Sequence, residues 1–155
     1  MAERANYLEL EPLILARLQP LIADWPTLRI DAARDVAGVL AKDQRLPALC
    51  VLYLGDASVE STDGKDQLVP AVQRWGVVVS HRDLREPEAG RVSVGELAAA
   101  VIAQLQGWLP RGPEGGLGRL RRQPAPAPIY SKEGAVYLPL TFTCRVLSRG
   151  ALGEP

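Results

Sequence analysis

The sequence predicts an α+β domain in which a single mixed or largely antiparallel sheet of four to five strands has helices packed against it. Segments with apolar residues at helical spacing alternate with segments of β-forming residues. One short apolar run is continuous, as in a strand that is covered on both faces, and the last segment alternates apolar and polar residues. With 155 residues, of which 47% are hydrophobic and 23% charged, the chain has the size and composition of one folded domain.

The first forty residues predict two helices with a short strand between them. Apolar residues at helical spacing predict a helix over about 8–22, bent near Pro20; they are Leu10, Ile14, Leu18 and Leu21. The stretch 25–30 predicts a turn that runs into a short strand. Asp31 offers a side-chain cap, so we expect a shorter helix after it, through about residue 40.

Two strands are expected next, joined by a polar loop. The continuous apolar run 48–54 predicts a buried strand with helices on both sides of it. A second strand is expected through Trp75, Val77 and Val79. The residues between them, 55–66, predict a solvated loop or hairpin tip, because they are polar and include the turn signal Thr-Asp-Gly-Lys.

A third helix is predicted to begin at Ser93. Ser93 and Glu96 have the spacing of a capping box, in which each side chain bonds the backbone N–H of the other residue. The charged stretch 82–91 before it is expected to be a loop. The buried stripe is expected to consist of Leu97, Val101, Leu105 and Trp108, with Gly107 and Pro110 ending the helix.

The last third of the chain predicts an extended arm and a long strand. Residues 110–128 are rich in proline and glycine, which favours an extended arm anchored by Leu117 and Leu120. Residues 136–146 alternate, so one face of this strand is expected in the core. Pro139 cannot donate a ladder hydrogen bond and is expected on an edge strand or at a bulge. Residues 1–150 thus form the predicted domain, and 151–155 a short flexible tail.

Little in the sequence points to catalysis, a metal or a cofactor, so we expect a protein that is not an enzyme. The 18 basic and 18 acidic residues give a formal net charge of zero, which disfavours tight nucleic-acid binding. Cys50 and Cys144 lie in apolar runs, where buried reduced thiols are expected; a disulfide or a reactive thiol is the alternative. Together with His81, which is expected to be a structural residue near a strand end, they are too few for a zinc site. No stretch has the ~18 apolar residues of a membrane span.

Two groups of charged residues are candidate interaction sites. Acidic residues gather in the polar loop, which is expected to be solvated; binding of a divalent cation is the alternative. Three arginines on the arm are expected to form a solvated edge or to contact an acidic patch of a protein partner; a phosphate-facing role is the alternative. With Pro139, the candidate interface residues are Asp56, Glu60, Asp63, Lys65, Asp66, Arg119, Arg121, Arg122 and Pro139.

The order of these landmarks resembles the tail terminator proteins of long-tailed bacteriophages and the small tail proteins of Mu-like prophages. The resemblance spans roughly residues 7–147 and departs from the pattern chiefly in the proline-rich arm. The landmarks are an N-terminal helix, a hydrophobic strand after 46–48, the run 74–79 that leads to 82–85, a helix ending at 105–110, and a final strand containing Tyr137 and Phe142.

The resemblance implies a structural virion protein that forms a hexameric ring on the head-proximal end of the tail tube. Such a ring stops tube growth and presents a surface to the connector of the head. The implied partners are further copies of the chain, the tail tube protein and the connector, while double-stranded DNA passes through the lumen without specific binding. Six compact domains with a radius of gyration of ~15 Å would leave a lumen of ~30–40 Å. Assembly is expected in the host cytoplasm, with no role for a membrane.

Other functions stay open. Another neck or tail-completion protein would share the ring but cap a different surface. A small enzyme or ligand-binding domain would need a pocket with convergent polar groups, and a cleft in which His81 meets an acidic side chain would favour it. In the virion reading, the loop 55–67 and the arm 110–128 supply contacts between subunits or to the tube, because both are long and not needed by the core.

Overall fold

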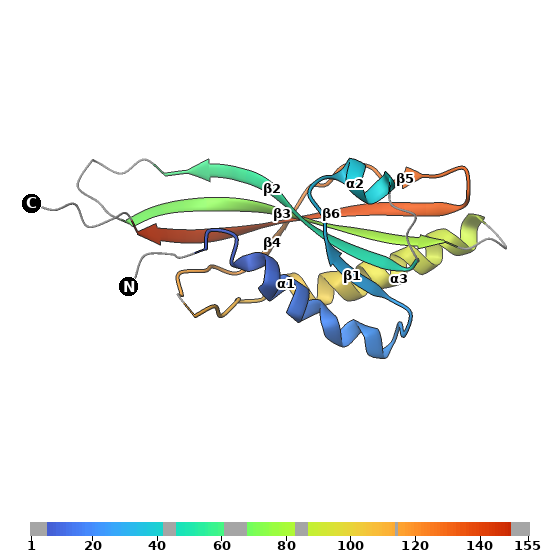
Figure 1. Ribbon diagram of the computed structural model, residues 1–155, viewed down its shortest axis with the longest axis horizontal. Helices are drawn as coiled ribbons and strands as arrows, with labels where there is room; N and C mark the ends of the chain where they lie inside the picture. The colour runs from blue at the N-terminus through green and yellow to red at the C-terminus, as the bar shows by residue number, and fades with distance from the viewer. Residues whose placement is uncertain (1–5, 42–45, 61–67, 83–86, 114, 150–155) are drawn as a thin grey trace, which may run out of the picture.

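A six-stranded sheet forms the centre of the fold, with helices against both of its faces (Figure 1). The computed structural model of the chain describes residues 6–41, 46–60, 68–82, 87–113 and 115–149. The predicted α+β class is confirmed. The elements in chain order are α1 (Leu10–Leu18), the 3-10 helix η1 (Gln19–Ala23), β1 (Arg29–Ala32), α2 (Val36–Ala41), β2 (Ala48–Val59), β3 (Leu68–Arg82), α3 (Pro87–Leu105), β4 (Arg121–Gln123), β5 (Ile129–Tyr130) and β6 (Ala135–Arg149).

The sheet is mixed, as predicted, because one of its pairings is parallel. The strand order is β1-β2-β3-β6-β4, and β5 also pairs with β6. β1 runs parallel to β2, and the other pairs are antiparallel. β3 and β6 pair from Leu68↔Arg149 to Arg82↔Ala135. Strands of this length span about 50 Å at ~3.4 Å per residue, so the molecule is elongated along them (Figure 1).

The main core lies between the sheet and the two helices α1 and α3. Alternate residues of β6 point into it, which confirms the predicted alternation of the last strand. Trp75 and Phe142 are the largest fully buried side chains. The stripe of α3 predicted from Leu97, Val101 and Leu105 is buried, whereas Trp108 follows the helix and is half-buried against the core.

The opposite face of the sheet is covered by α2 over part of its length. Val39 of α2 packs against Cys50 and Leu52 of β2 and Val78 of β3. Residues 48–52 are therefore buried on both sides, and this explains why their apolar run is continuous instead of alternating. The prediction that a helix lies on each side of this strand is confirmed.

Two predicted helix starts are wrong. α2 is capped by Asp35, whose Oδ1 accepts a hydrogen bond from the N–H of Gly38 at 2.6 Å. Asp31 instead lies in β1 and forms an ion pair with Arg29. α3 begins at Pro87, so Ser93 lies inside the helix and not at its cap. Proline tolerates the first turn of a helix, where its missing N–H would have no partner anyway, and that signal outweighed the capping-box spacing.

β2 continues through part of the segment that the sequence predicted as a loop. It extends to Val59 and pairs with β3 through Val59↔Ala71, with register shifts on either side of Asp56. Gly55, with φ of 94°, lies within the first shift, between Tyr53 and Asp56, and allows the left-handed backbone there. The polar composition of residues 55–59 led to the wrong prediction of a loop, because this end of β2 is exposed. Residues 61–67 and 150–155, including the predicted tail 151–155, lie outside the described residues.

The predicted arm at 110–128 is not extended throughout: the chain leaves the end of α3 and returns to it at Leu120, whose backbone bonds both Gly107 and Trp108. Residues 117, 118 and 121–123 run along β6. Leu120 is fully buried and Leu117 is half-buried against the core, so the two predicted anchors are confirmed. β4 lies within the arm, so the sheet gains a short strand there. The proline run 124–128 follows β4 and leads to β5.

Pro139 does not lie on an edge strand, which corrects its predicted position. It pairs with Val78 on the β3 side of β6. On the other side of β6 the ladder stops between the pairs Gln123↔Thr141 and Ile129↔Tyr137, and Pro139 falls in this gap. An internal strand can hold a proline where one of its edges has no ladder partner, because the missing N–H then breaks no hydrogen bond on that edge.

Candidate functional site

The two long edges of the sheet carry the charged residues that the sequence singled out. β1 pairs with β2 over Ala48–Val51, and in the described part of the chain no strand covers the outer edge of β2 beyond that. β4 is the last strand at the opposite side of the sheet. We call Asp56 and Glu60 at the end of β2 the acidic edge, and Arg121 and Arg122 of β4 the basic edge.

Asp56 of the acidic edge is bound by two tyrosines of its own chain. Its Oδ1 accepts hydrogen bonds from the hydroxyls of Tyr53, at 2.6 Å, and Tyr7, at 2.9 Å. Burial raises the pKa of the Tyr53 hydroxyl above its usual range, and the hydrogen bond to Asp56 raises it further. Asp56 therefore has a structural role in addition to its place on the edge.

Gln73 anchors the segment before α1 to the sheet. It is fully buried in β3, and its Nε2 donates to the carbonyl oxygen of Tyr7 at 2.7 Å. Its Oε1 accepts from the indole N–H of Trp75 at 3.0 Å. Sequence reasoning missed both Gln73 and Tyr7. A polar residue in phase with buried strand positions was the signal for Gln73, but nothing in the sequence pointed to Tyr7.

Glu60, the second residue of the acidic edge, is held loosely. Its Oε2 lies 3.8 Å from an Nη of Arg145, and both side chains are 62% exposed. An ion pair at this separation in water contributes little to stability. The carboxylate of Glu60 is therefore accessible to a partner molecule.

The three arginines of the arm do not act alike. Arg119 donates from Nη1 to the carbonyl oxygen of Gly107 at 2.9 Å, just past the end of α3, so it ties the arm to that helix. Arg121 and Arg122 are exposed in β4, opposite Thr143 and Phe142, and point to opposite faces of the sheet. Among the described residues, neither of these two side chains forms an ion pair or a hydrogen bond.

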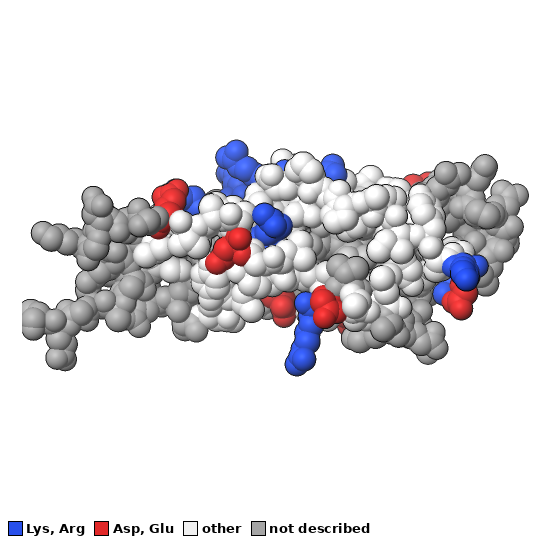
Figure 2. All heavy atoms as spheres, turned by 90° about the horizontal axis from the view of Figure 1, so that it is seen from above, with Lys and Arg blue, Asp and Glu red and all other residues white. Residues whose placement is uncertain are grey.

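A depression of about 500 Å³ lies on the sheet face away from α1 and α3. Gly76 of β3 contributes no side chain there, and Leu54 leans over it, 3.1 Å from where a Cβ would lie. The side of the molecule in Figure 2 shows scattered charges of both signs and no block of one sign. The residues that line the depression are Leu54, Ala57, Arg74, Gln123, Pro124, Pro126, Thr141 and Thr143.

A smaller depression, of about 450 Å³, lies where α1 meets the end of α3. The guanidinium of Arg17 lies 5.3 Å from the ring centroid of Trp108, and its Nε donates to the carbonyl oxygen of Gln104 at 3.0 Å. These contacts tie Arg17 to the neighbouring helix, which suits a role in packing. Its guanidinium is therefore already engaged within the chain.

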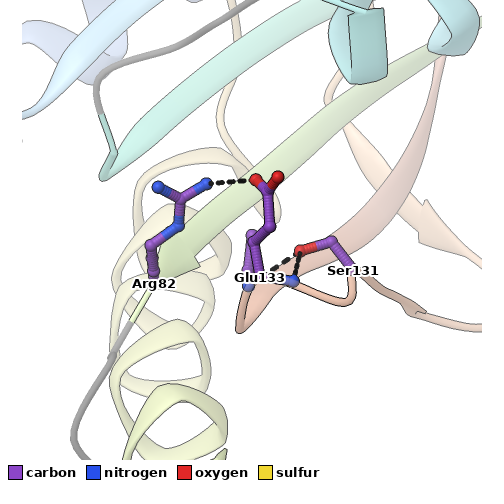
Figure 3. A network of polar contacts seen from close by, with 4 residues as sticks. Arg82, Ser131 and Glu133 are labelled. Carbon is purple, nitrogen blue, oxygen red and sulfur yellow. Dashed lines mark hydrogen bonds and ion pairs between the residues drawn. The ribbon is translucent and has the colours of Figure 1, made fainter.

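The far end of β3 is closed by local polar contacts. Arg82 forms an ion pair of 3.5 Å with Glu133, whose backbone N–H donates to Ser131 Oγ in the turn before β6 (Figure 3). His81 accepts from the backbone N–H of Arg82 at 2.8 Å, as expected of a structural residue near a strand end. These contacts hold the turn and assemble no reaction centre.

The structure gives further findings on the candidate sites. Cys50 and Cys144 are buried and outside any disulfide, as predicted. In the described ranges, no group of three or more His, Cys, Asp or Glu side chains could hold a metal ion. No helix there is long and apolar enough to cross a membrane. Of the candidate interface residues, Asp63, Lys65 and Asp66 lie outside the described part of the chain.

Comparison with known proteins gives a family for the chain. A family model described as phage tail terminator protein matches residues 4–151. A solved structure titled as the virion of a native gene transfer agent particle contains a chain with the same fold. That chain is 22% identical in sequence with a TM-score of 0.63, and the alignment covers 90% of this chain and 95% of that one. No curated protein matches significantly. Because the family model spans nearly the whole sequence, the chain belongs to the phage tail terminator proteins, which are structural proteins of the bacteriophage tail.

Proposed function

We propose that this chain forms a ring, with six copies as the expected number, on the head-proximal end of the tail tube. The ring ends polymerisation of the tube and offers a surface to which the connector of the head binds. It assembles in the host cytoplasm and remains in the virion. Double-stranded DNA passes through its lumen without specific binding, and the chain acts as a structural part and not as an enzyme.

The observation that carries this proposal is the family match over residues 4–151. The fold likeness to a chain in a gene transfer agent virion supports a place in a phage-like particle. The edge of β2 beyond Val51 supports self-association, because no strand of the described residues covers it and an edge strand can pair with another chain. Neutral net charge suits a DNA channel, since a strongly basic lining would hold the phosphates.

The decisive experiment compares phage particles made with and without this protein by electron microscopy. Loss of a terminator leaves tube growth unchecked, so we expect tails longer and more variable than normal, with few heads attached. Normal tails that lack heads would indicate another neck or tail-completion protein instead. Adding the purified protein back should restore a uniform tail length, and labelled protein should be found at the head-proximal end.

A further inference from the structure

The two edges of the sheet carry opposite charges. Asp56 lies on β2 and Glu60 directly follows it at one edge, and Arg121 and Arg122 lie on β4 at the other. The chain as a whole has a formal net charge of zero, so this separation is not visible in its composition. Opposite charges on opposite sides of one body favour head-to-tail contacts, in which one edge meets the other edge of the next copy.

We propose that the acidic edge of one copy binds the basic edge of the next, and that repetition of this contact closes the ring. The contact deepens the proposed function and rests on it for the statement that the repeat closes. A heterologous contact of this kind yields a closed ring where its rotation closes and a filament where it does not. The occupant of each edge is thus a second copy of the same chain.

The registers of the strands support a direct match of the edges. Asp56 is level with Gln73 of β3, which in turn is level with Cys144 of β6. Arg121 is paired with Thr143, the neighbour of Cys144. Asp56 and Arg121 therefore differ by one residue, or about 3.4 Å, in height along the strands. A rotation about an axis parallel to the strands would bring them together.

The strand directions support the same contact. β2 is antiparallel to β3, β3 to β6, and β6 to β4, so β2 and β4 run in opposite directions. Rotation about an axis along the strands leaves these directions unchanged. β2 of one copy would then lie antiparallel to β4 of the next, which is the arrangement of the commoner kind of strand pair.

The irregular backbone of β2 suits a selective contact. Register shifts on either side of Asp56, the first of which contains the left-handed Gly55, twist this edge and make pairing with an arbitrary strand less favourable. Selectivity for the basic edge then comes from the charges of the side chains. Arg121 and Arg122 are exposed and free of ion pairs within the described residues, and Glu60 has just the weak pair with Arg145.

The test reverses the charge of each edge separately and then of both. The variants are Asp56→Arg, Arg121→Glu and the double variant, because Asp56 and Arg121 are nearly level along the strands. The readout is self-association by sedimentation, with and without purified tail tubes. Each single variant places like charges at the contact and should raise the concentration needed for association about tenfold. The double variant restores opposite charges and should associate more tightly than either single variant.

Matched controls reverse exposed charges away from both edges. Glu96→Arg on α3 and Lys132→Glu in the turn before β6 should leave association unchanged. Circular dichroism and thermal melting establish that each variant folds. If Asp56→Arg does not fold, Asp56→Asn replaces it. It keeps an acceptor for the tyrosines while it removes a charge, and it should weaken association by a smaller factor.

The proposed contact and the proposed function fail in different ways. Single variants that associate like the unaltered protein, or a double variant weaker than both, would overturn the contact while tube capping stands. An unaltered protein that stays monomeric even with tubes would also overturn the contact. The variants could associate as the charges predict while the unaltered protein leaves tubes uncapped and particles without it have tails of normal length. This result would support the contact and overturn the function.

Discussion

At the scale of single residues, buried polar contacts hold the segment before α1 and the arm in place. Glu9, just before α1, is 7% exposed, and a Cβ on Gly112 of the arm would overlap its Oε1. A side chain at position 112 would therefore displace the Glu9 carboxylate from its place against the arm. Asp56 and Gln73 fasten the neighbouring residue Tyr7 to the sheet.

Replacing Gly112 with alanine should lower the free energy of unfolding by about 1–3 kcal/mol, because Glu9 must move to admit the new methyl group. Urea unfolding of the purified protein measures this. Gly95→Ala is the matched control, since nothing lies within 4 Å of a Cβ there and alanine suits a helix. That control should stabilise the protein by about 0.5–1 kcal/mol. Equal stability of Gly112→Ala and the unaltered protein would contradict the close approach.

The Tyr53–Asp56 hydrogen bond gives a prediction about pH. Tyr53→Phe should cost about 1.5–3 kcal/mol near pH 8, because it removes a hydrogen bond to a charged acceptor. The pKa of Tyr53 is raised in the folded protein, so the unfolded chain loses this proton first. Its contribution is thus fully present below about pH 10, the unfolded value, and falls as the pH rises further.

Urea unfolding of the unaltered protein and Tyr53→Phe at several pH values tests this sign. The difference in stability between them should shrink above about pH 10. Tyr130→Phe, at an exposed position in β5, is the control and should differ little from the unaltered protein at any pH. A difference that grows with pH would mean that Tyr53 is not held as a neutral donor to Asp56.

At the scale of elements, the arm is attached to the sheet by one fully buried side chain. Leu120 is 0% exposed, and its backbone N–H and carbonyl oxygen bond Trp108 and Gly107 at the end of α3. Gly118 and Leu147 form further backbone hydrogen bonds that join the arm to β6. The arm that carries the basic edge is therefore positioned by the core.

Leu120→Ala should lower the free energy of unfolding by about 2–5 kcal/mol, the usual cost of a cavity left by a buried leucine. It should also loosen β4, which would appear as faster amide hydrogen exchange at residues 121–123. Leu54→Ala is the control, because Leu54 is 40% exposed and should cost less. Unchanged exchange in β4 would show that Leu120 does not position the basic edge.

At the scale of the whole molecule, the long sheet separates the two charged edges. β3 and β6 form its centre, and β2 and β4 lie at either side of them. The lumen estimate of ~30–40 Å assumed a compact body, whereas the structure is elongated along its strands (Figure 1). The width of the proposed ring therefore depends on which axis of the molecule lies along the tube.

Association through charged edges should weaken as salt is added. Raising the ionic strength from ~0.1 M to ~1 M shortens the Debye length from ~10 Å to ~3 Å and screens exposed charges. Sedimentation of the unaltered protein should show weaker association in high salt. The double variant Asp56→Arg with Arg121→Glu should respond in the same direction. Association that strengthens with salt would indicate an apolar contact in place of the charged one.

Local patterns in the sequence were sufficient for most elements. The alternation in 136–146, the helical spacing of Leu97, Val101 and Leu105, and the continuous apolar run 48–52 depend on period and hydrophobicity, which neighbouring residues report directly. The predicted start of α3 at Ser93 was wrong, because Ser93 and Glu96 can have capping-box spacing inside a helix as well. The predicted end of β2 at residue 54 was wrong, because exposed strand residues resemble a loop in composition.

By itself, the sequence determined the fold class, the buried faces and the arm with its anchor Leu120, since these follow from local periodicity and composition. The tertiary structure alone decided which distant residues meet. It placed Asp56 beside Tyr7 and Tyr53, Gln73 beneath Tyr7, and Pro139 in a gap of the ladder. Strand order and register set these contacts, and they depend on pairings between segments far apart in the chain that no local pattern encodes.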